Sequence, residues 1–290
     1  MKIKAYAKIN LTLDVTGKLP DGYHTIESVM QSVSLCDDVE IEKNDTGKVT
    51  TETNIPYLPV NEKNTVWKAA NSFFKHTGIK DGIHIKVMKN IPDRAGMGGG
   101  SADAAAVLHG MNRIYGEMLS EQKLCEIGEE VGADVPFCVA GGTCLCAGKG
   151  EQLQPVPPMP DCVLVICKPS VGMSTLRAYA MIDQYPIAQP KTPQMLAALE
   201  TRDIDKIAGA IANRFDEVMH ISEVGMIKSI MKRSGAVGAL MTGSGSAVYG
   251  IFKDKKRAFA CMEKLKKQGR VYITRPICFE EYRDTVISEK

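Results

Sequence analysis

The sequence predicts a two-domain α/β or α+β protein. Segments in which apolar and polar residues alternate with a period of two are followed by segments with helical spacing, and no segment repeats in tandem. A proline-rich stretch at residues 155–160 is the clearest linker in the chain. A chain of 290 residues is long enough for two ordinary domains. We therefore expect domains over residues 1–154 and 155–290.

The first half begins with a predicted strand, because apolar and polar residues alternate from Ile3 to Leu13. Lys8 and Asn10 fall on its polar face. Pro20-Asp21-Gly22 predicts a tight turn before Tyr23. Further strands are expected over residues 29–35, 39–43 and 83–87. Helices are expected over residues 65–76, 102–115 and 120–131, the first after Asn64 and the last ending at Gly132.

The second half alternates in the same way. A buried strand is expected over residues 163–167, and helices over residues 192–199, 204–211 and 223–234. A small-residue turn, Thr242–Ser246, precedes a strand at residues 247–252. An amphipathic helix at residues 256–268 and a strand at residues 271–275 follow. The pattern does not say whether the sheets are parallel.

Composition excludes several classes of function. Lysine and arginine number 36 against 34 acidic residues, and a net charge of +2 gives no electrostatic case for a nucleic-acid partner. No run of 18 apolar residues predicts a membrane span, and charges interrupt the N-terminus where a signal peptide would be apolar. The nine scattered cysteines lack zinc spacing and fit buried, reduced thiols in a cytoplasm. No metal cluster is expected from the five dispersed histidines.

A glycine-rich string over residues 92–106 is the most informative motif. It holds four glycines in five positions, at residues 96–100, between a predicted strand and a predicted helix. Such a loop turns backbone N–H groups towards one concavity, and the helix N-terminus adds its positive dipole end. The P-loop, dinucleotide and hydrolase-elbow patterns are all absent. The alternative of a ligand-free flexible loop is disfavoured by its entropy cost. We expect a triphosphate site formed by Gly96, Met97, Gly98, Gly99, Gly100, Ser101, Ala102 and Asp103.

Asp134 is the candidate general base. It follows a predicted helix end within Gly132-Ala133-Asp134-Val135-Pro136-Phe137, flanked by apolar residues. A helix cap ahead of Pro136 is an equally good interpretation from local sequence alone. Lys8 likewise has a non-catalytic interpretation, as a solvated lysine on an edge strand.

Three ordered motifs resemble those of the GHMP kinases, the galacto-, homoserine, mevalonate and phosphomevalonate kinase superfamily. They are Ala7–Leu11, residues 91–106 and Thr242–Ser246, and the resemblance covers nearly the whole chain in the same order and spacing. It implies an α+β fold: an N-terminal domain with a left-handed βαβ crossover and a C-terminal ferredoxin-like domain. It also implies that ATP, with Mg²⁺, and an alcohol acceptor bind in the cleft between them.

A narrower resemblance implies the acceptor. The strings A-K-I-N-L-x-L-D-V-x-G-K-L-P-D-G-Y-H and G-A-D-V-P-F are similar to the branch of GHMP kinases that phosphorylates the 2-hydroxyl of a cytidine diphosphate-linked methylerythritol in the non-mevalonate isoprenoid route. By position, Asp134 would be the base and Lys8 its partner. The remaining positions would bind substrates: Tyr23, His24, Tyr179 and Thr175 the cytosine, Asn10 the erythritol or phosphates, Gly243, Ser244 and Gly245 the acceptor diphosphate, and Asn64 and Lys89 ATP.

Two departures and two rival functions stay open at this stage. The third motif reads T-G-S-G-S-A, where the family commonly has proline and threonine after the second glycine. Arg94 either reaches a phosphate or faces water. The rivals are another GHMP kinase, acting on homoserine or a sugar, and a non-catalytic ATP-binding sensor. We expect a cytoplasmic monomer or weak homodimer.

Overall fold

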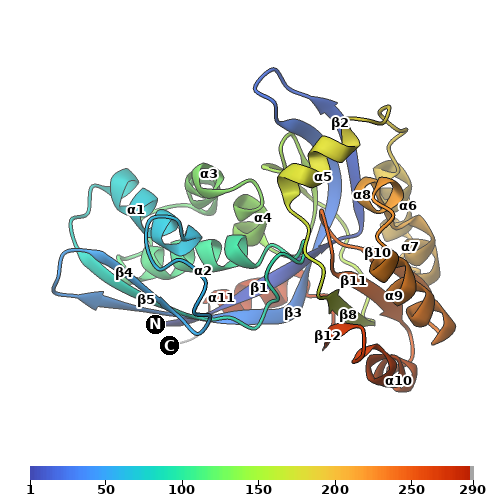
Figure 1. The fold of residues 1–290 in the computed structure, drawn as a ribbon. Coiled ribbons are helices and arrows are strands. Elements are labelled where there is room, and N and C mark those ends of the chain that lie inside the picture. Colours follow the sequence, from blue (N-terminus) through green and yellow to red (C-terminus); the bar gives the residue numbers. More distant parts are fainter. Residues whose placement is uncertain (288–290) are drawn as a thin grey trace.

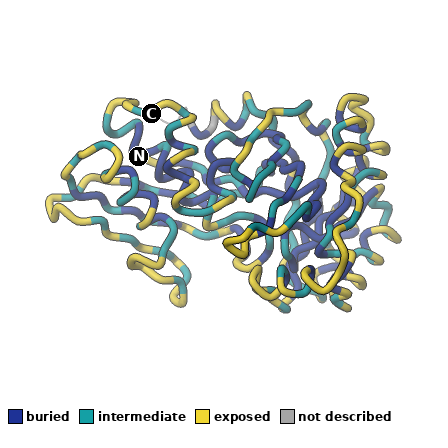
Figure 2. Tube along the Cα trace, turned by 90° about the horizontal axis from the view of Figure 1, so that it is seen from above, coloured by how far each residue is buried: buried dark blue, intermediate teal, exposed yellow. Residues whose placement is uncertain are grey.

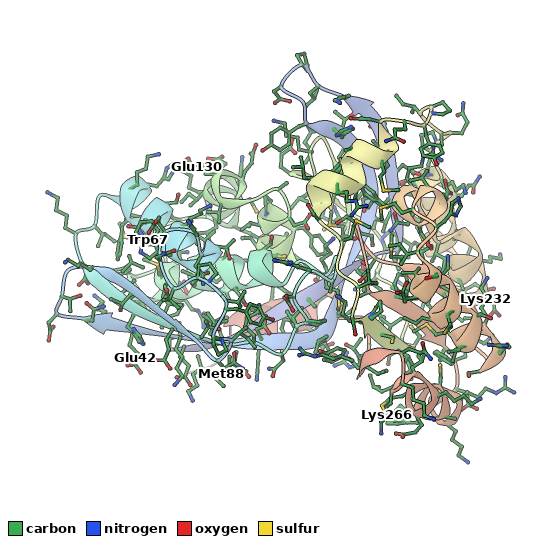
Figure 3. All side chains as sticks on the ribbon, viewed as in Figure 1. Glu42, Trp67, Met88, Glu130, Lys232 and Lys266 are labelled. Carbon is green, nitrogen blue, oxygen red and sulfur yellow. The ribbon has the colours of Figure 1, made fainter. Side chains whose placement is uncertain are left out.

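A computed structural model describes residues 1–287 as two lobes with a cleft between them (Figure 1). Buried segments run through both lobes, and exposed residues gather on the outer helices and loops (Figure 2). Side chains fill the interior of each lobe, while charged residues such as Glu42, Lys232 and Lys266 project outwards (Figure 3). Among the described residues, no helix combines the length and apolar character needed to cross a membrane.

The N-terminal lobe is built on strand β3 (His24–Asn44), which pairs antiparallel with four neighbours. Its 21 residues correct the sequence prediction of two strands at 29–35 and 39–43. The single strand expected from Ile3 to Leu13 is in fact two, which separate at Leu11. The other strands of this sheet are β1 (Lys2–Asn10), β2 (Thr12–Lys18), β4 (Val49–Thr53), β5 (Gly82–Met88), β6 (Thr143–Ala147), β7 (Gln152–Pro155) and β9 (Ala212–Asn213).

Helices of the N-terminal lobe pack against this sheet and one another. The first, α1 (Thr65–Thr77), connects the parallel pair β4 and β5 and so forms the βαβ unit. It begins and ends where the sequence predicts: Asn64 Oδ1 accepts a hydrogen bond from Val66 N at 3.1 Å, and Gly78 closes it with φ = 73°. The others are α2 (Gly99–Ile114), α3 (Glu121–Val131) and α4 (Val135–Ala140).

The C-terminal lobe has the ferredoxin-like order of elements. An antiparallel sheet runs in the order β10-β11-β8-β12, so the first strand in sequence lies between the third and the fourth. The βαββαβ core consists of β8 (Val163–Pro169), α9 (Ser222–Arg233), β10 (Gly238–Met241), β11 (Val248–Phe252), α10 (Lys255–Leu265) and β12 (Gly269–Thr274). Between β8 and α9 lie α5 (Thr175–Ile182), α6 (Thr192–Glu200), α7 (Ile204–Ala210) and α8 (Arg214–Val218).

The two lobes share elements across the expected boundary at residue 155. Strand β9 pairs in parallel with β2, and α11 (Phe279–Ile287) returns to pack on β1. In that contact the rings of Tyr6 and Tyr282 lie 5.7 Å apart, and the Tyr282 hydroxyl donates to the Cys138 carbonyl. The β2–β3 hairpin in turn lies beside α5 of the C-terminal lobe (Figure 1). The cleft is therefore walled by strands and helices that tie the lobes together.

Candidate active site

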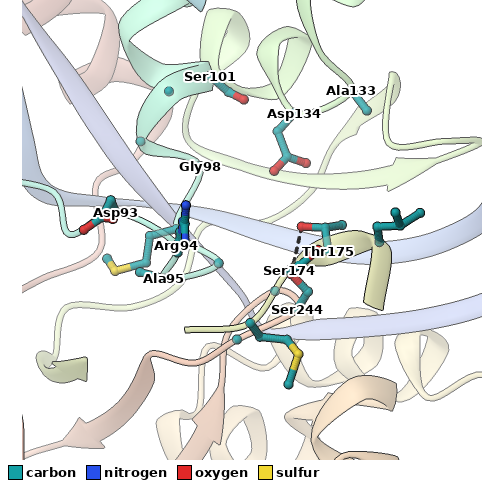
Figure 4. Close-up of a pocket in the computed structure, with 18 of the residues that line it drawn as sticks. Asp93, Arg94, Ala95, Gly98, Ser101, Ala133, Asp134, Ser174, Thr175 and Ser244 are labelled. Carbon is teal, nitrogen blue, oxygen red and sulfur yellow. Dashed lines mark hydrogen bonds between the residues drawn. The ribbon is translucent and has the colours of Figure 1, made fainter. Parts of the chain in front are cut away.

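The cleft has a volume of about 1510 Å³ and is lined by both lobes. Pockets for a single small ligand usually measure roughly 300–1000 Å³, so this one can hold two substrates side by side. Ser101 and Asp134 project into it from the N-terminal lobe, and Thr175 and Ser244 lie on the opposite side (Figure 4). The motifs that the sequence singled out therefore meet in one space.

The glycine-rich loop leads directly into α2, which begins at Gly99, three residues earlier than predicted. Gly98 is its N-cap, with φ = 67°, a left-handed conformation that glycine adopts without strain. Gly99, Gly100 and Ser101 form the first turn, where backbone N–H groups have no partner within the helix. These amides and the positive end of the helix dipole make an anion site at the cleft wall.

Two members of the predicted triphosphate site have other roles. Ala102 is buried, does not line the cleft, and its N–H donates to Gly98 O at 2.8 Å, so its assignment as a ligand was wrong. Met97 touches the cleft, but its side chain is buried and its carbonyl accepts from Lys8 N at 3.0 Å. Met97 therefore joins the loop to β1.

Lys89 lies between two buried carboxylates. Its Nζ is 2.6 Å from Asp103 Oδ2 and also donates to Asp37 Oδ2. Burial raises the pKa of Asp103 to about 8, against the attraction of the Lys89 ammonium. Burial alone would lower the pKa of Lys89, but the two carboxylates raise it. Lys89 and Asp103 both line the cleft, and the Lys89 ammonium is engaged by the side chains of Asp37 and Asp103.

Sequence reasoning missed Asp37. Its Oδ1 accepts from Ile91 N at 2.7 Å, which fixes the start of the segment that leads into the glycine-rich loop. A signal was present, because Asp37 takes an inward position in the alternating run Val33, Leu35, Asp37, Val39, Ile41. A carboxylate at such a position requires a buried partner.

Lys8 and Asp134 come together at the centre of the cleft. Lys8 Nζ lies 3.4 Å from Asp134 Oδ2 and donates to Asn10 Oδ1 at 2.7 Å. Asp134 holds the N-cap position of α4, but its side chain accepts no capping hydrogen bond and is 34% exposed. The helix-cap interpretation therefore does not describe what this carboxylate does. The carboxyl group of Asp134 faces the cleft beside the buried side chain of Lys8.

Asn10 is an internal connector. Besides the bond from Lys8, its Oδ1 accepts from Gly243 N at 3.0 Å, and its Nδ2 donates to Ser28 Oγ at 2.8 Å. It is 1% exposed. These bonds hold Lys8 and the loop at residues 242–246. Asn10 also lines the cleft, so its expected contact with the acceptor stays a prediction.

The same bonds correct the assignment of that second loop. Gly243 N is engaged by Asn10, and Gly245 N donates to Thr242 O at 3.0 Å. In the described structure, Ser244 N is the one amide of the three without a partner. Ser244 Oγ lies 3.2 Å from Thr175 Oγ1 (Figure 4). Both hydroxyls line the cleft.

An aromatic group lines the end of the cleft near the β2–β3 hairpin. The rings of His24 and Tyr179 stack directly, with centroids 4.5 Å apart and an interplanar angle of 18°. A base cannot lie between these two rings as they stand. Tyr23 and Tyr179 both line the cleft, so the expected place of Tyr179 on the other side of the base stays a prediction. Tyr23 is 61% exposed, and Lys149 Nζ lies 4.4 Å from its ring centroid. Tyr23 therefore offers the open face for a stacked base.

Asn64 also lines the cleft, but both ends of its amide are used. Oδ1 caps α1, and Nδ2 donates to Pro59 O at 2.6 Å.

No group of three or more histidine, cysteine or acidic side chains that could hold a metal occurs among the described residues. Asp183, which sequence reasoning missed, accepts a hydrogen bond from His24 Nε2 at 2.6 Å.

Two family models match the chain. The GHMP kinases N terminal domain matches residues 64–142, and the GHMP kinases C terminal model matches residues 195–271. A homoserine kinase structure from Cytophaga hutchinsonii shares the fold, with a TM-score of 0.75 at 20% identity over 94% of each chain.

More similar proteins share a single name. A 4-diphosphocytidyl-2-C-methyl-D-erythritol kinase of Clostridium botulinum (strain Eklund 17B / Type B) is 43% identical over 96% of this chain and 100% of its own length. The kinase of that name from Caldicellulosiruptor bescii is 44% identical over 92% of this chain and 94% of its own. A crystal structure of 4-(cytidine 5'-diphospho)-2C-methyl-D-erythritol kinase has a TM-score of 0.79 at 28% identity, covering 95% of this chain and 99% of the other.

Proposed function

The chain belongs to the GHMP kinases and, within them, to the 4-diphosphocytidyl-2-C-methyl-D-erythritol kinases, and we propose that Asp134 and Lys8 carry out the reaction of that family here. The reaction is the ATP-dependent phosphorylation of the 2-hydroxyl of 4-diphosphocytidyl-2-C-methyl-D-erythritol in the non-mevalonate route to isoprenoid precursors. The observation that carries the residue assignment is the Lys8–Asp134 pair, 3.4 Å apart at the centre of the cleft.

In the proposed step, Asp134 accepts the proton of the 2-hydroxyl as that oxygen bonds to the γ-phosphorus. The bond from the γ-phosphorus to the bridging oxygen breaks, and ADP leaves with the electron pair. Such transfers depend on positioning and charge stabilisation more than on covalent help from the protein. Lys8 supplies both, because its buried ammonium is fixed by Asn10 and lies beside the base.

ATP is proposed to place its phosphates against the first turn of α2, where the amides of Gly99, Gly100 and Ser101 point outwards from the helix. Arg94 lines the same cleft, and its side chain has no hydrogen-bond or ion-pair partner among the described residues. We assign it to a phosphate. Mg²⁺ would arrive on the phosphates, where the Ser101 hydroxyl at the cleft wall would add a protein oxygen, as Mg²⁺ commonly binds through phosphates and water.

The acceptor is proposed to lie along the other half of the cleft. Its cytosine would stack on Tyr23 and meet the ring edge of His24, while Thr175 and Ser244 face its diphosphate. Stacking of a base on an aromatic ring is worth roughly 1–3 kcal/mol, which suits an anchor remote from the reacting hydroxyl. We place the enzyme in the cytoplasm, where ATP is supplied, as a monomer or weak homodimer.

The first experiment measures ADP release from purified protein with ATP and Mg²⁺ across a panel of acceptors. The panel comprises 4-diphosphocytidyl-methylerythritol, the same sugar phosphate without CMP, homoserine, mevalonate and galactose. We expect turnover with the cytidylyl compound alone. Turnover with a different acceptor would overturn the substrate, and ATP binding without any turnover would favour the sensor.

The Asp134→Ala variant tests the assignment of the base. We expect kcat to fall by about 10²–10⁴-fold, the usual contribution of a general base, with ATP affinity within a few-fold of wild type. Glu129→Ala removes an exposed acid from the neighbouring helix α3 and should leave kcat unchanged. Near-normal turnover by Asp134→Ala would exclude this carboxylate as the base.

A further inference from the structure

Asp183 is an acid at the C-terminal end of α5 that the reaction does not use. It stands one helical turn after Tyr179, and both contact His24 of the opposite lobe. Tyr179 covers the face of the imidazole, and Asp183 Oδ1 accepts from Nε2 at 2.6 Å. His24 is thus fixed in position and in rotation by two residues of one helix.

The second oxygen of Asp183 is also engaged, because Lys18 Nζ donates to Oδ2. Hydrogen bonds from Lys18 and then from His24 hold the pKa of Asp183 below its ordinary value. The carboxylate is therefore ionised and can only accept.

A neutral imidazole carries one proton, and the bond to Asp183 places that proton on Nε2. Nδ1 is then a lone-pair acceptor. The imidazole of His24 makes no other hydrogen bond within the described chain. Its Nδ1 is not enclosed either, because the fully enclosed polar side-chain atoms without a partner among the described residues are Thr51 Oγ1 and Asp103 Oδ1. His24 lines the cleft, so this acceptor is available to a ligand.

We infer that Asp183 fixes the tautomer of His24 and thereby makes the site select a pyrimidine with a 4-amino group over one with a 4-oxo group. The inference rests on the proposed function, which places the acceptor's base at Tyr23 and His24. The amino group of cytosine donates to Nδ1, whereas the 4-oxygen of uracil would bring two lone pairs together. Asp183 is a positioning residue, because it acts on the base through His24.

The test compares kcat/KM for the cytidylyl acceptor and its uridylyl counterpart. Discrimination by one well-placed polar contact is worth roughly 10- to 100-fold, and we expect at least this preference in wild type. In Asp183→Asn the amide can accept from Nε2–H or donate to bare Nε2, so both tautomers become possible. We expect the ratio to fall about tenfold, mainly through a higher KM for the cytidylyl compound.

Asp205→Asn is the matched control, because Asp205 is an exposed acid that does not line the cleft. Its Oδ2 lies 2.7 Å from Lys253 Nζ. Its ratio should equal that of wild type. If Asp183 merely ties the two lobes together, Asp183→Asn would lower kcat/KM equally for both acceptors and leave the ratio unchanged. That result would overturn the inference.

The ¹⁵N spectrum of histidine-labelled protein gives a second readout that needs no turnover. We expect His24 of wild type to show a protonated Nε2 and a bare Nδ1, and Asp183→Asn to show both tautomers. A protonated Nδ1 in wild type would overturn the inference even if the kinase reaction is confirmed. If neither acceptor is phosphorylated, that result counts against the proposed function, and the ¹⁵N spectrum still decides the tautomer of His24.

Discussion

Two glycine-rich loops meet in the cleft, and they use their backbone amides differently. The loop at residues 96–101 ends in the first turn of α2, whose N–H groups have no intrahelical partner. In the loop at residues 242–246, Gly243 N donates to Asn10 and Gly245 N donates to Thr242 O. The first loop therefore offers backbone N–H donors to a ligand. In the second loop, most of the glycine-flanked N–H groups already donate to acceptors within the protein.

The difference shows that glycine content alone does not identify an anion site. In the second loop, glycine permits close contact between backbones: a Cβ on Gly243 would lie 2.7 Å from Gly96 O, and one on Gly96 would lie 2.2 Å from Thr242 O. Thr242 Oγ1 also donates to Gly96 O at 3.3 Å. The loop at residues 242–246 thus acts as a brace for the phosphate loop, and Asn10 joins the brace to Lys8.

The largest effect should come from Gly98→Ala in the phosphate loop. Alanine is strained at φ = 67°, and its Cβ would lie 3.1 Å from Lys8 Cγ. Lys8 must therefore give by a few tenths of an ångström, and the loop must shift further to relieve the backbone strain. A displacement of about 1 Å near the reacting groups can lower the rate about 100-fold, and we expect this loss in kcat/KM. Steady-state kinetics with both substrates measures it.

Gly78→Ala is the matched control for backbone strain. Gly78 has φ = 73° at the end of α1, and no atom lies within 4 Å of its would-be Cβ. We expect it to lose about 1–2 kcal/mol of stability with unchanged kcat/KM for the folded fraction. Equal losses of activity in the two variants would mean that the Lys8 contact is irrelevant.

A smaller effect, on stability and activity together, should come from Asn10→Ala. The substitution leaves Gly243 N without an acceptor and removes the 2.7 Å bond that fixes Lys8. An unsatisfied buried donor costs about 1–3 kcal/mol, so we expect about 2 kcal/mol less stability in urea unfolding and a lower kcat.

A substrate-binding role for Asn10 has a different signature. Asn10→Ala would then raise the KM for the acceptor and leave the free energy of unfolding unchanged. Asn10→Asp retains an acceptor for Gly243 N and should keep more of the stability than the alanine variant does. If the alanine variant is as stable as wild type, the second loop is not braced in this way.

Much of the site could be predicted from the sequence where the determining contacts are local. The period of two placed Lys8 and Asn10 on one face, and they bond to each other. Asn64 and Gly78 mark the ends of α1 through bonds within two to four residues of themselves. The order of motifs and the resemblance together predicted the α+β fold with its ferredoxin-like lobe.

The rest depends on partners distant in sequence. Asp37 interrupts an apolar run, and the sequence therefore predicted a gap between two strands at this point. In the structure, Lys89 and Ile91, more than 50 residues away, donate hydrogen bonds to the buried Asp37 carboxylate, and β3 continues through it without a break. Asp183 was not singled out from the sequence, because its partner His24 lies 159 residues away and only the fold brings the two together. The engaged amides of the second loop were hidden for the same reason, since Gly243 lies 233 residues from Asn10.

Counted per pH unit, the smallest effect concerns the phosphate side, where Lys89 lies between Asp37 and Asp103. Burial raises the pKa of Asp103 to about 8, so between about pH 4 and 8 the folded state holds a proton that the unfolded state releases. Stability should therefore fall as pH rises through this range, by at most about 1.4 kcal/mol per pH unit. Asp103→Asn imitates the protonated carboxyl and should abolish this pH dependence of the free energy of unfolding. Urea unfolding at several pH values measures it. Asp205→Asn is the control and gives the pH dependence that remains when an exposed acid is removed. If Asp103 is instead ionised throughout by Lys89, the variant will be less stable than wild type at every pH, and the difference will not change between pH 5 and 8.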